Sequence, residues 1–235
     1  MRMELIALAV VFAAILWWIY ARDRARIKAS RGGLFDGCRD LFESCAIAQD
    51  GVDMAVLDGR YRGHDFRILP IIDHVNLRKL PSLWLLVTLR ERGPYEGAVD
   101  FLVRPQNTEF YSPSSSLPVA LEIPPAWPAH ATLRTDRRDA MPPLPLIGRH
   151  MGFFDDPKAK ELLVAPLGVR LVYQADQGRR AHYLVLRQAE FEGLTVAPEL
   201  LRDLMDRAIA LHYDLQRSVH GQAPDDGKTE TEEAA

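Results

Sequence analysis

The stretch Leu5–Tyr20, LIALAVVFAAILWWIY, decides the architecture of this chain. It contains no charged residue and no proline, so it predicts an unbroken helix that is apolar on every side. At 1.5 Å per residue such a helix is about 24 Å long. That is slightly less than the ~30 Å hydrocarbon core of a bilayer, and a flanking apolar residue on either side can extend it. We therefore expect a transmembrane helix.

Aromatic residues and then basic residues follow this apolar run. Tryptophan and tyrosine rings favour the boundary between membrane and water. A basic segment, residues 22–31, comes next, whereas only Arg2 and the terminal amine precede the run. By the positive-inside rule, the remainder of the chain should face the cytoplasm. The predicted membrane-anchor residues are Leu5, Phe12, Leu16, Trp17, Trp18 and Tyr20, and the predicted basic juxtamembrane residues are Arg22, Arg24, Arg26 and Lys28.

A cleaved signal peptide is the main alternative for this segment. Its basic region would be Arg2 alone, offset by Glu4, and no small-x-small cleavage site follows the apolar run. Bulky aromatics followed by a basic cluster are instead typical of a stop-transfer sequence. We therefore predict a single-pass protein of the inner membrane, with its soluble domain on the cytoplasmic side.

Length and composition fit one domain behind the anchor. The chain has 235 residues, 48% of them hydrophobic, which is enough for a sizeable core. The formal net charge is −3, and the last fifteen residues carry five acidic residues against one lysine. The rest of the chain is thus nearly neutral, which excludes a nucleic-acid-binding surface. Cys38 and Cys45 have no metal-site spacing, so we expect reduced thiols packed on one apolar helix face.

The sequence predicts an α+β protein with three parts. Residues 1–31 form the membrane anchor and basic segment, residues 32–220 form one domain of mainly antiparallel strands packed with a few helices, and residues 221–235 form a disordered acidic tail. Apolar residues at three- and four-residue steps predict an amphipathic helix over residues 34–45. A hairpin should then turn at Arg62-Gly63, followed by strands over residues 82–89 and 98–103 in a simple meander.

The second half of the domain begins with a proline-rich region, residues 104–145. Its nine prolines exclude a long regular element, so we expect a loop that covers one sheet face, with short extended pieces at residues 119–123 and 131–135. Asp155-Asp156-Pro157 is typical of a helix start and predicts a helix over residues 158–164. Two strands, 168–174 and 181–187, should form a second hairpin. A final helix should begin at Pro198, with an apolar stripe of Leu201, Leu204, Met205, Ala208, Ile209, His212 and Leu215.

No catalytic motif accompanies this architecture. The chain contains no GxSxG elbow, P-loop, dinucleotide fingerprint or HExxH pair. Four polar residues offer acid–base chemistry if the fold brings them together: His64, Asp65, His150 and Asp155. Solvated turn residues and local capping explain the same four positions without chemistry. We expect no cofactor, no bound metal and no catalytic residue.

Three functions remain open. The first is a binding or assembly module whose partners are the lipid bilayer and another membrane-associated protein, with no nucleic acid involved. The second is a membrane-tethered enzyme of hydrolase type, which requires the four polar residues to converge in a pocket. The third is a sensor of lipid headgroups or small ligands that uses the basic juxtamembrane residues.

Overall fold

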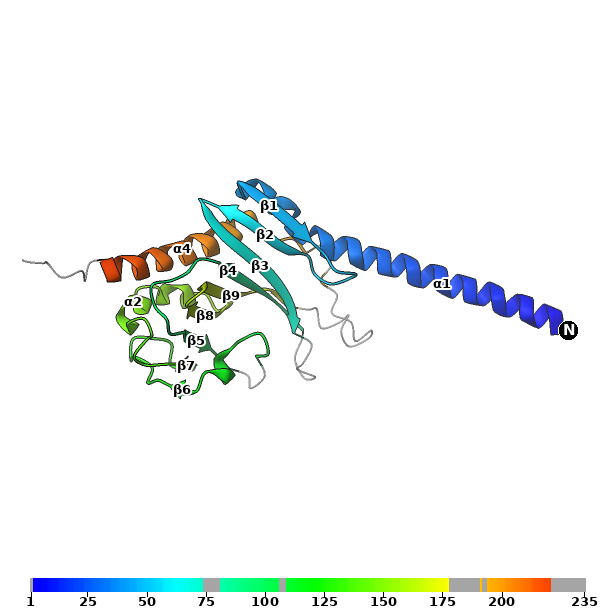
Figure 1. The fold of residues 1–235 in the computed structure, drawn as a ribbon. Helices are drawn as coiled ribbons and strands as arrows, with labels where there is room; N and C mark the ends of the chain where they lie inside the picture. The colour runs from blue at the N-terminus through cyan, green and yellow to red at the C-terminus, as the bar shows by residue number, and fades with distance from the viewer. Residues whose placement is uncertain (1, 74–80, 106–108, 178–190, 192–193, 221–235) are drawn as a thin grey trace, which may run out of the picture.

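The structure of the chain is a computed structural model that describes residues 2–73, 81–105, 109–177, 191 and 194–220. It confirms the α+β class: a long apolar N-terminal helix precedes an antiparallel sheet that packs against helices (Figure 1). The predicted strand at residues 181–187 and the acidic tail lie outside the described residues.

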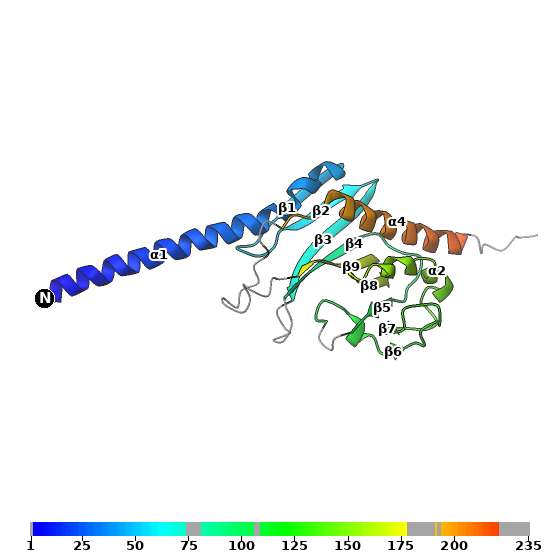
Figure 2. The same cartoon turned by 180° about the vertical axis from the view of Figure 1, so that it is seen from behind.

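The N-terminal helix α1, Arg2–Gly32, projects away from the rest of the molecule in both views (Figures 1 and 2). It runs through the apolar stretch and the basic segment without a break, as the sequence predicts. Three further helical turns support the sheet: α2 (Leu144–Gly148) and the 3₁₀ helices η2 (Ser114–Ser116) and η3 (Met151–Asp155).

The sheet contains nine strands among the described residues, and every neighbouring pair is antiparallel. Their order across the sheet is β1-β2-β3-β4-β9-β8-β5-β7-β6. The strands are β1 (Ser44–Ala48), β2 (Val56–Tyr61), β3 (His64–Asp73), β4 (Ser82–Leu89), β5 (Val99–Val103), β6 (Val119–Ala120), β7 (Ala131–Thr135), β8 (Ala159–Ala165) and β9 (Gly168–Gln177).

The expected meander is therefore only partly right. Strands β1 to β4 do follow one another, but β9 and β8 lie between β4 and β5. Local connection lengths cannot reveal this arrangement, because the β8–β9 hairpin comes from a distant part of the chain and inserts as a unit.

The last helix, α4 (Pro198–His220), lies across one face of the sheet, which we call the helix face (Figure 2). Every residue of its predicted apolar stripe is buried, which confirms that prediction. Beneath it lie Leu83, Leu85 and Val87 of β4 and Leu171 of β9, all in one large apolar core. Alternate residues of the same strands point to the opposite side, the back face, where Trp84, Leu86 and Val172 pack with Tyr111.

Two turns show why particular residues are needed. The first hairpin reverses at Arg62 and Gly63, whose φ angles of 50° and 81° match the twist of the flanking strands and confirm the predicted turn. The second reversal joins β8 to β9 through Pro166 and Leu167. There Gly168 has φ of 151°, and a Cβ would lie 1.9 Å from the carbonyl oxygen of Leu89, so only glycine fits.

The amphipathic helix predicted for residues 34–45 is wrong in its second part. The segment forms a 3₁₀ helix, η1 (Gly33–Leu41), and then enters β1. Leu34, Phe35 and Cys38 are buried as the spacing predicts, because a 3₁₀ turn and an α-helical turn bury similar positions. Cys45, however, lies on β1 and does not share a helix face with Cys38.

The helix predicted for residues 158–164 is also wrong, because this segment is strand β8. Asp156 does accept a backbone hydrogen bond, from Lys158 at 2.8 Å, but that bond closes a turn that leads into a strand. Pairing with both β5 and β9 outweighs the local helix signal. The spacing of the predicted second hairpin also places a turn at residues 175–178, but β9 continues to Gln177, which pairs with Ser82 of β4.

The proline-rich region contributes to the sheet and to its core. Strand β7 coincides with one expected extended piece, and β6 covers only the start of the other. Trp127, from the loop between them, packs edge-on against Phe101 at a centroid distance of 5.1 Å. Part of this region therefore covers the helix-face core.

Candidate functional site

Helix α1 is the first candidate for a functional element. It is long and apolar enough to cross a membrane: a window of 18 residues has a mean hydropathy of 1.7, and none of it is buried. Phe12, Leu16, Trp17, Trp18 and Tyr20 are all exposed, so the helix has no protein surface to cover its apolar sides. By length and composition a signal sequence gives the same pattern.

The end of α1 is attached directly to the domain. The side chain of Gln49, in the β1–β2 loop, donates a hydrogen bond to the backbone oxygen of Lys28 at 3.0 Å. The Arg31 guanidinium donates to Val52 at 2.9 Å, and the backbone of Ala55 donates to the carbonyl of Arg31. The basic side chains Arg22, Arg24, Arg26 and Lys28 are exposed along the helix between these contacts and the apolar stretch.

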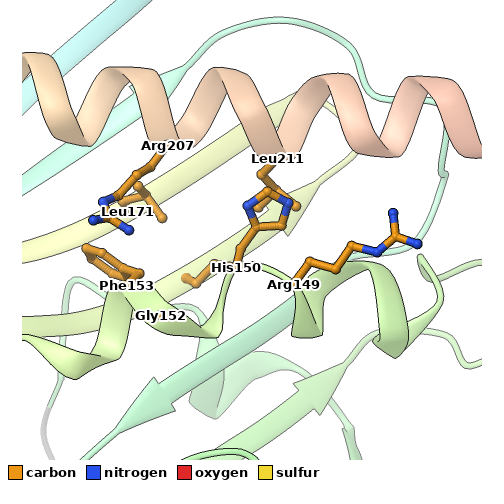
Figure 3. A pocket seen from close by; sticks show the side chains of 8 residues that line it. Arg149, His150, Gly152, Phe153, Leu171, Arg207 and Leu211 are labelled. Carbon is orange, nitrogen blue, oxygen red and sulfur yellow. The ribbon is translucent and has the colours of Figure 1, made fainter.

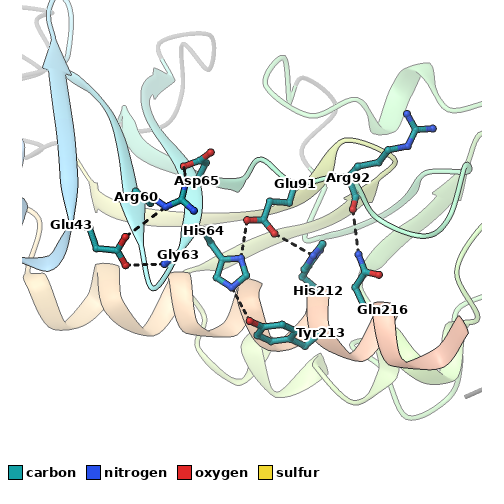
Figure 4. A network of polar contacts seen from close by, with 10 residues as sticks. All are labelled: Glu43, Arg60, Gly63, His64, Asp65, Glu91, Arg92, His212, Tyr213 and Gln216. Atoms are coloured by element: carbon teal, nitrogen blue, oxygen red, sulfur yellow. Dashed lines mark hydrogen bonds and ion pairs between the residues drawn. The ribbon is translucent and has the colours of Figure 1, made fainter. Parts of the chain in front are cut away.

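A polar network joins the sheet to the second half of α4 (Figure 4). His64, at the start of β3, lies 2.9 Å through Nδ1 from the Glu91 carboxylate and 3.0 Å through Nε2 from the Tyr213 hydroxyl. A carboxylate only accepts hydrogen bonds, so Nδ1 carries the hydrogen in the neutral ring, and Tyr213 donates to Nε2. The other carboxylate oxygen of Glu91 is 3.4 Å from Nε2 of His212.

Burial governs the charge of this network. His212 is only 5% exposed, and this burial lowers its pKa. The neighbouring His64 lowers the pKa of His212 further, whereas the negative charge of Glu91 raises it. Its Nδ1 has no hydrogen-bond partner among the described residues. The network thus links α4 to the sheet, because the Glu91 carboxylate contacts both His64 of β3 and His212 of α4.

His150 contacts helix α4 one residue beyond Tyr213, at Asp214. His150, before η3, lies 3.0 Å through Nε2 from Asp214. Burial opposes ionisation of Asp214, but hydrogen bonds from Arg217 and His150 hold its pKa below the usual range. A cavity of about 90 Å³ adjoins His150, between η3 and α4 (Figure 3). That volume is too small for a drug-sized ligand or substrate, whose pockets measure roughly 300–1,000 Å³.

The four polar residues singled out in the sequence thus occupy different surroundings. His64 and His150 both lie against α4, but they contact different residues there. Asp65 points to the other side of β3, where it is exposed and 3.5 Å from Arg60. Asp155 is exposed at the end of η3. No hydrogen bond or ion pair joins any two of the four within the described chain, so the convergence that the enzyme alternative requires is not seen there.

A buried polar cluster on the back face was not foreseen from the sequence. Asp100 on β5 and Glu161 on β8 are both fully buried, and neither oxygen of Asp100 makes a hydrogen bond of normal geometry to a described residue. Glu161 accepts a bond from Arg170 at 3.2 Å. Nearby, the buried Lys160 ammonium donates to the Arg104 carbonyl at 2.6 Å and lies 3.2 Å from Glu109.

The two carboxyl groups hold their protons more strongly than ordinary carboxyl groups do. Burial raises the pKa of Asp100 well above its usual range, and the charge of Glu161 raises it further, against Ser114 and Arg170. Burial also raises the pKa of Glu161, against the opposing effects of Arg170 and Ser112. The sequence gives little sign of this pair, because the two residues are distant in the chain and only the pairing of β5 with β8 brings them together.

Metal binding finds no support in the described part of the chain, where no group of three or more histidine, cysteine, aspartate or glutamate side chains could hold an ion.

Comparison with known proteins adds little. No protein-family model matches the chain, and no curated protein is similar to it in sequence. A search of solved structures finds a distant likeness to the crystal structure of the mycobacterial trehalose monomycolate transport factor A, TtfA. The two chains are 12% identical, the match covers 72% of this chain and 73% of the other, and the TM-score is 0.31. A TM-score this low does not establish a shared fold, so no function follows from it.

Proposed function

We propose that this chain is a single-pass inner-membrane protein whose cytoplasmic domain is a binding module for another membrane-associated protein. The observation that carries the proposal is the exposed apolar helix α1, which continues without a break into hydrogen bonds with the β1–β2 loop. A helix with no protein cover needs lipid to bury its apolar sides.

The charge distribution supports the cytoplasmic orientation. The exposed basic residues follow the apolar stretch, on the side of the domain. Helix α1 is about 46 Å long at 1.5 Å per residue, whereas the hydrocarbon core is about 30 Å thick. The last turns of α1 therefore lie outside the hydrocarbon and hold the domain close to the headgroups, without a flexible linker.

Strand β1 is the surface we assign to the partner. Among the described residues it is the outermost strand of the sheet, so one row of its backbone groups faces away from the sheet, and its side chains Ser44, Ala46 and Ala48 are exposed. An extended segment of a second protein can pair with such an edge. The strand begins close to the end of α1, so a membrane-bound partner meets it at a high effective concentration.

The test is affinity purification of the full-length protein from its own membranes in mild detergent, with a tag after Ala235. Two lysines at exposed positions of the edge strand, Ala46→Lys with Ala48→Lys, should abolish recovery of a near-stoichiometric partner, because edge charges oppose strand addition. The matched control is Ala210→Lys, at an exposed position of α4, which should retain the partner. Recovery of the tagged protein alone, from wild-type membranes, would overturn the proposal.

A further inference from the structure

A larger cavity opens on the back face, beside the buried carboxyl pair. Its volume is about 300 Å³, at the lower end of the range for small-molecule sites. Four hydroxyl groups and one guanidinium line it: those of Ser112, Ser114, Ser115, Thr132 and Arg134. Phe110, whose side chain is about half exposed, stands at the same cavity.

The fold explains why these groups converge. Thr132 and Arg134 are alternate residues of β7, so both point to the back face, while Leu133 between them lies in the helix-face core. The serines arrive on the turn before η2 and on η2 itself, where the backbone of Ser114 donates to the Ser112 hydroxyl at 3.1 Å. The Ser114 hydroxyl lies 3.4 Å from that of Thr132, which joins the two elements.

Arg134 is held in place but not neutralised. Its Nε donates to the Leu117 carbonyl at 2.7 Å, which fixes the plane of the guanidinium. Within the described residues it has no carboxylate partner in an ion pair. A fixed guanidinium with free N–H groups presents a fork that matches the oxygens of a phosphate or carboxylate.

The acidic groups around the cavity are compensated. Glu109 lines it, but its carboxylate is 3.2 Å from the Lys160 ammonium. Behind the serines, Glu161 is bonded to Arg170, and burial beside Glu161 raises the pKa of the Asp100 carboxyl. The charge offered to a ligand is therefore that of Arg134, and the hydroxyls add neutral donors.

We propose that this cavity binds a small phosphate monoester, with the phosphate on Arg134 and the hydroxyls of Ser114 and Ser115, and with the organic part against Phe110. A phosphate carries three oxygens that accept hydrogen bonds, which suits several donors around one positive charge. This binding site is separate from the strand edge assigned to the protein partner, so either assignment can fail without the other.

The test uses full-length protein in nanodiscs and compares two sources of the same chemistry. Glycerol phosphate is titrated against nanodiscs of neutral lipid, with glycerol as the control, and binding is followed by calorimetry. A parallel set of nanodiscs contains phosphatidic acid, whose headgroup is also a phosphate monoester, and reports whether the lipid competes with glycerol phosphate.

The matched pair of variants is Arg134→Gln and Arg138→Gln. Each arginine donates to a backbone carbonyl of the segment that leads into and forms β6, Leu117 and Ala120 respectively, but only Arg134 lines the cavity. We expect saturable binding that Arg134→Gln weakens at least tenfold and Arg138→Gln leaves unchanged, because only Arg134→Gln removes a charge-assisted contact with the phosphate. Ser114→Ala with Ser115→Ala should weaken it several-fold, which keeps the test valid if Arg134→Gln fails to fold.

If phosphatidic acid competes with glycerol phosphate in the wild type but not in the Arg134→Gln variant, the ligand is a membrane lipid. If glycerol phosphate binds and phosphatidic acid does not compete, the ligand is a soluble phosphate monoester. Failure of wild-type protein to bind either source would overturn the proposal. So would equal weakening by the two arginine variants, because that result marks a non-specific charge effect.

Discussion

The two faces of the sheet are formed by the same alternating strands, but they bury different kinds of side chain. Under α4, alternate residues of β4 and β9 are leucine and valine, and they form one continuous apolar core with the helix. On the back face the same strands carry Trp84 and Arg170, beside Asp100 and Glu161 of their neighbours. The helix face therefore stabilises the fold, whereas the back face holds buried polar groups that cost free energy unless they are paired.

This contrast between the apolar helix face and the polar back face separates residues that stabilise the fold from residues that are candidates for function. Burial of apolar surface explains the helix face apart from the histidine network at its rim. Several back-face atoms, among them Trp84 Nε1, the Tyr111 hydroxyl and both oxygens of Asp100, have no hydrogen-bond partner among the described residues. Buried groups of this kind are rare in proteins and call for a functional or structural explanation. The ligand cavity lies on this face.

The largest effect is expected on the helix face. Leu204→Ala removes a side chain that is 1% exposed in the centre of α4 and should lower the free energy of unfolding by about 2–5 kcal/mol, because the core cannot close fully around the void. Urea unfolding of the full-length protein in detergent, followed by circular dichroism, measures it. Arg202→Ala, at an exposed position of the same helix, should change stability by less than about 0.5 kcal/mol. Equal losses in both variants would refute the assignment of the core.

A substitution on the back face should act in the opposite direction. In the native protein the pKa of Asp100 is raised well above the usual value of 3.8. The native state therefore loses stability as the pH rises from about 3.8 through this raised pKa. Asp100→Asn removes this penalty, and its amide can donate to Glu161. We expect a gain of about 1 kcal/mol at pH 8 and almost none at pH 3.5.

The control for this prediction is Asp139→Asn, at an exposed position. Urea unfolding at the two pH values is compared for both variants. If Asp100→Asn destabilises the protein at pH 8, the carboxylate is paired in its charged form, and the contrast between the faces is much weaker.

The smallest effect concerns the histidine network at the rim of the helix face. Burial lowers the pKa of His212, so the unfolded chain takes up this proton at a higher pH than the native protein does. Stability from this group is fully present above about pH 6.5 and is lost as the pH falls through the native pKa. Between pH 7.5 and 5.5, His212→Gln should reduce the decrease in the free energy of unfolding by less than about 1 kcal/mol.

The matched control is His130→Gln, an exposed histidine, which should leave the pH dependence of the unfolding midpoint unchanged. A midpoint that falls more steeply on acidification in His212→Gln than in the wild type would show that protonation of His212 stabilises the protein, contrary to the effect of burial.

Periodicity predicts those parts of the fold that bury one apolar face. The stripe of α4, the strand over residues 82–89 and the turn at Arg62-Gly63 were all predictable, because each depends on residues that are close in sequence. Strand β8 was mistaken for a helix, since Asp156 and Pro157 give the same signal at a helix start and at a turn before a strand. Long-range pairing with β5 decides between them.

The candidate site was less predictable for a related reason. His64 and His150 could be selected by residue type, but their partners Glu91 and Asp214 come from segments that only the tertiary fold brings close. Arg134 and the serines of the back-face cavity are ordinary in the sequence. Their convergence follows from the position of β7 between β5 and β6, which the sequence does not encode locally.

The central claim, that α1 is an uncleaved anchor, has a direct test. Membranes from cells that express the protein with a tag after Ala235 are washed with alkaline carbonate, and the mass of the retained tagged protein is measured. We predict that the intact chain, including residues 1–31, stays in the membrane pellet. A shorter, soluble product that begins beyond the apolar stretch would contradict the account, because it would identify that stretch as a removed signal sequence.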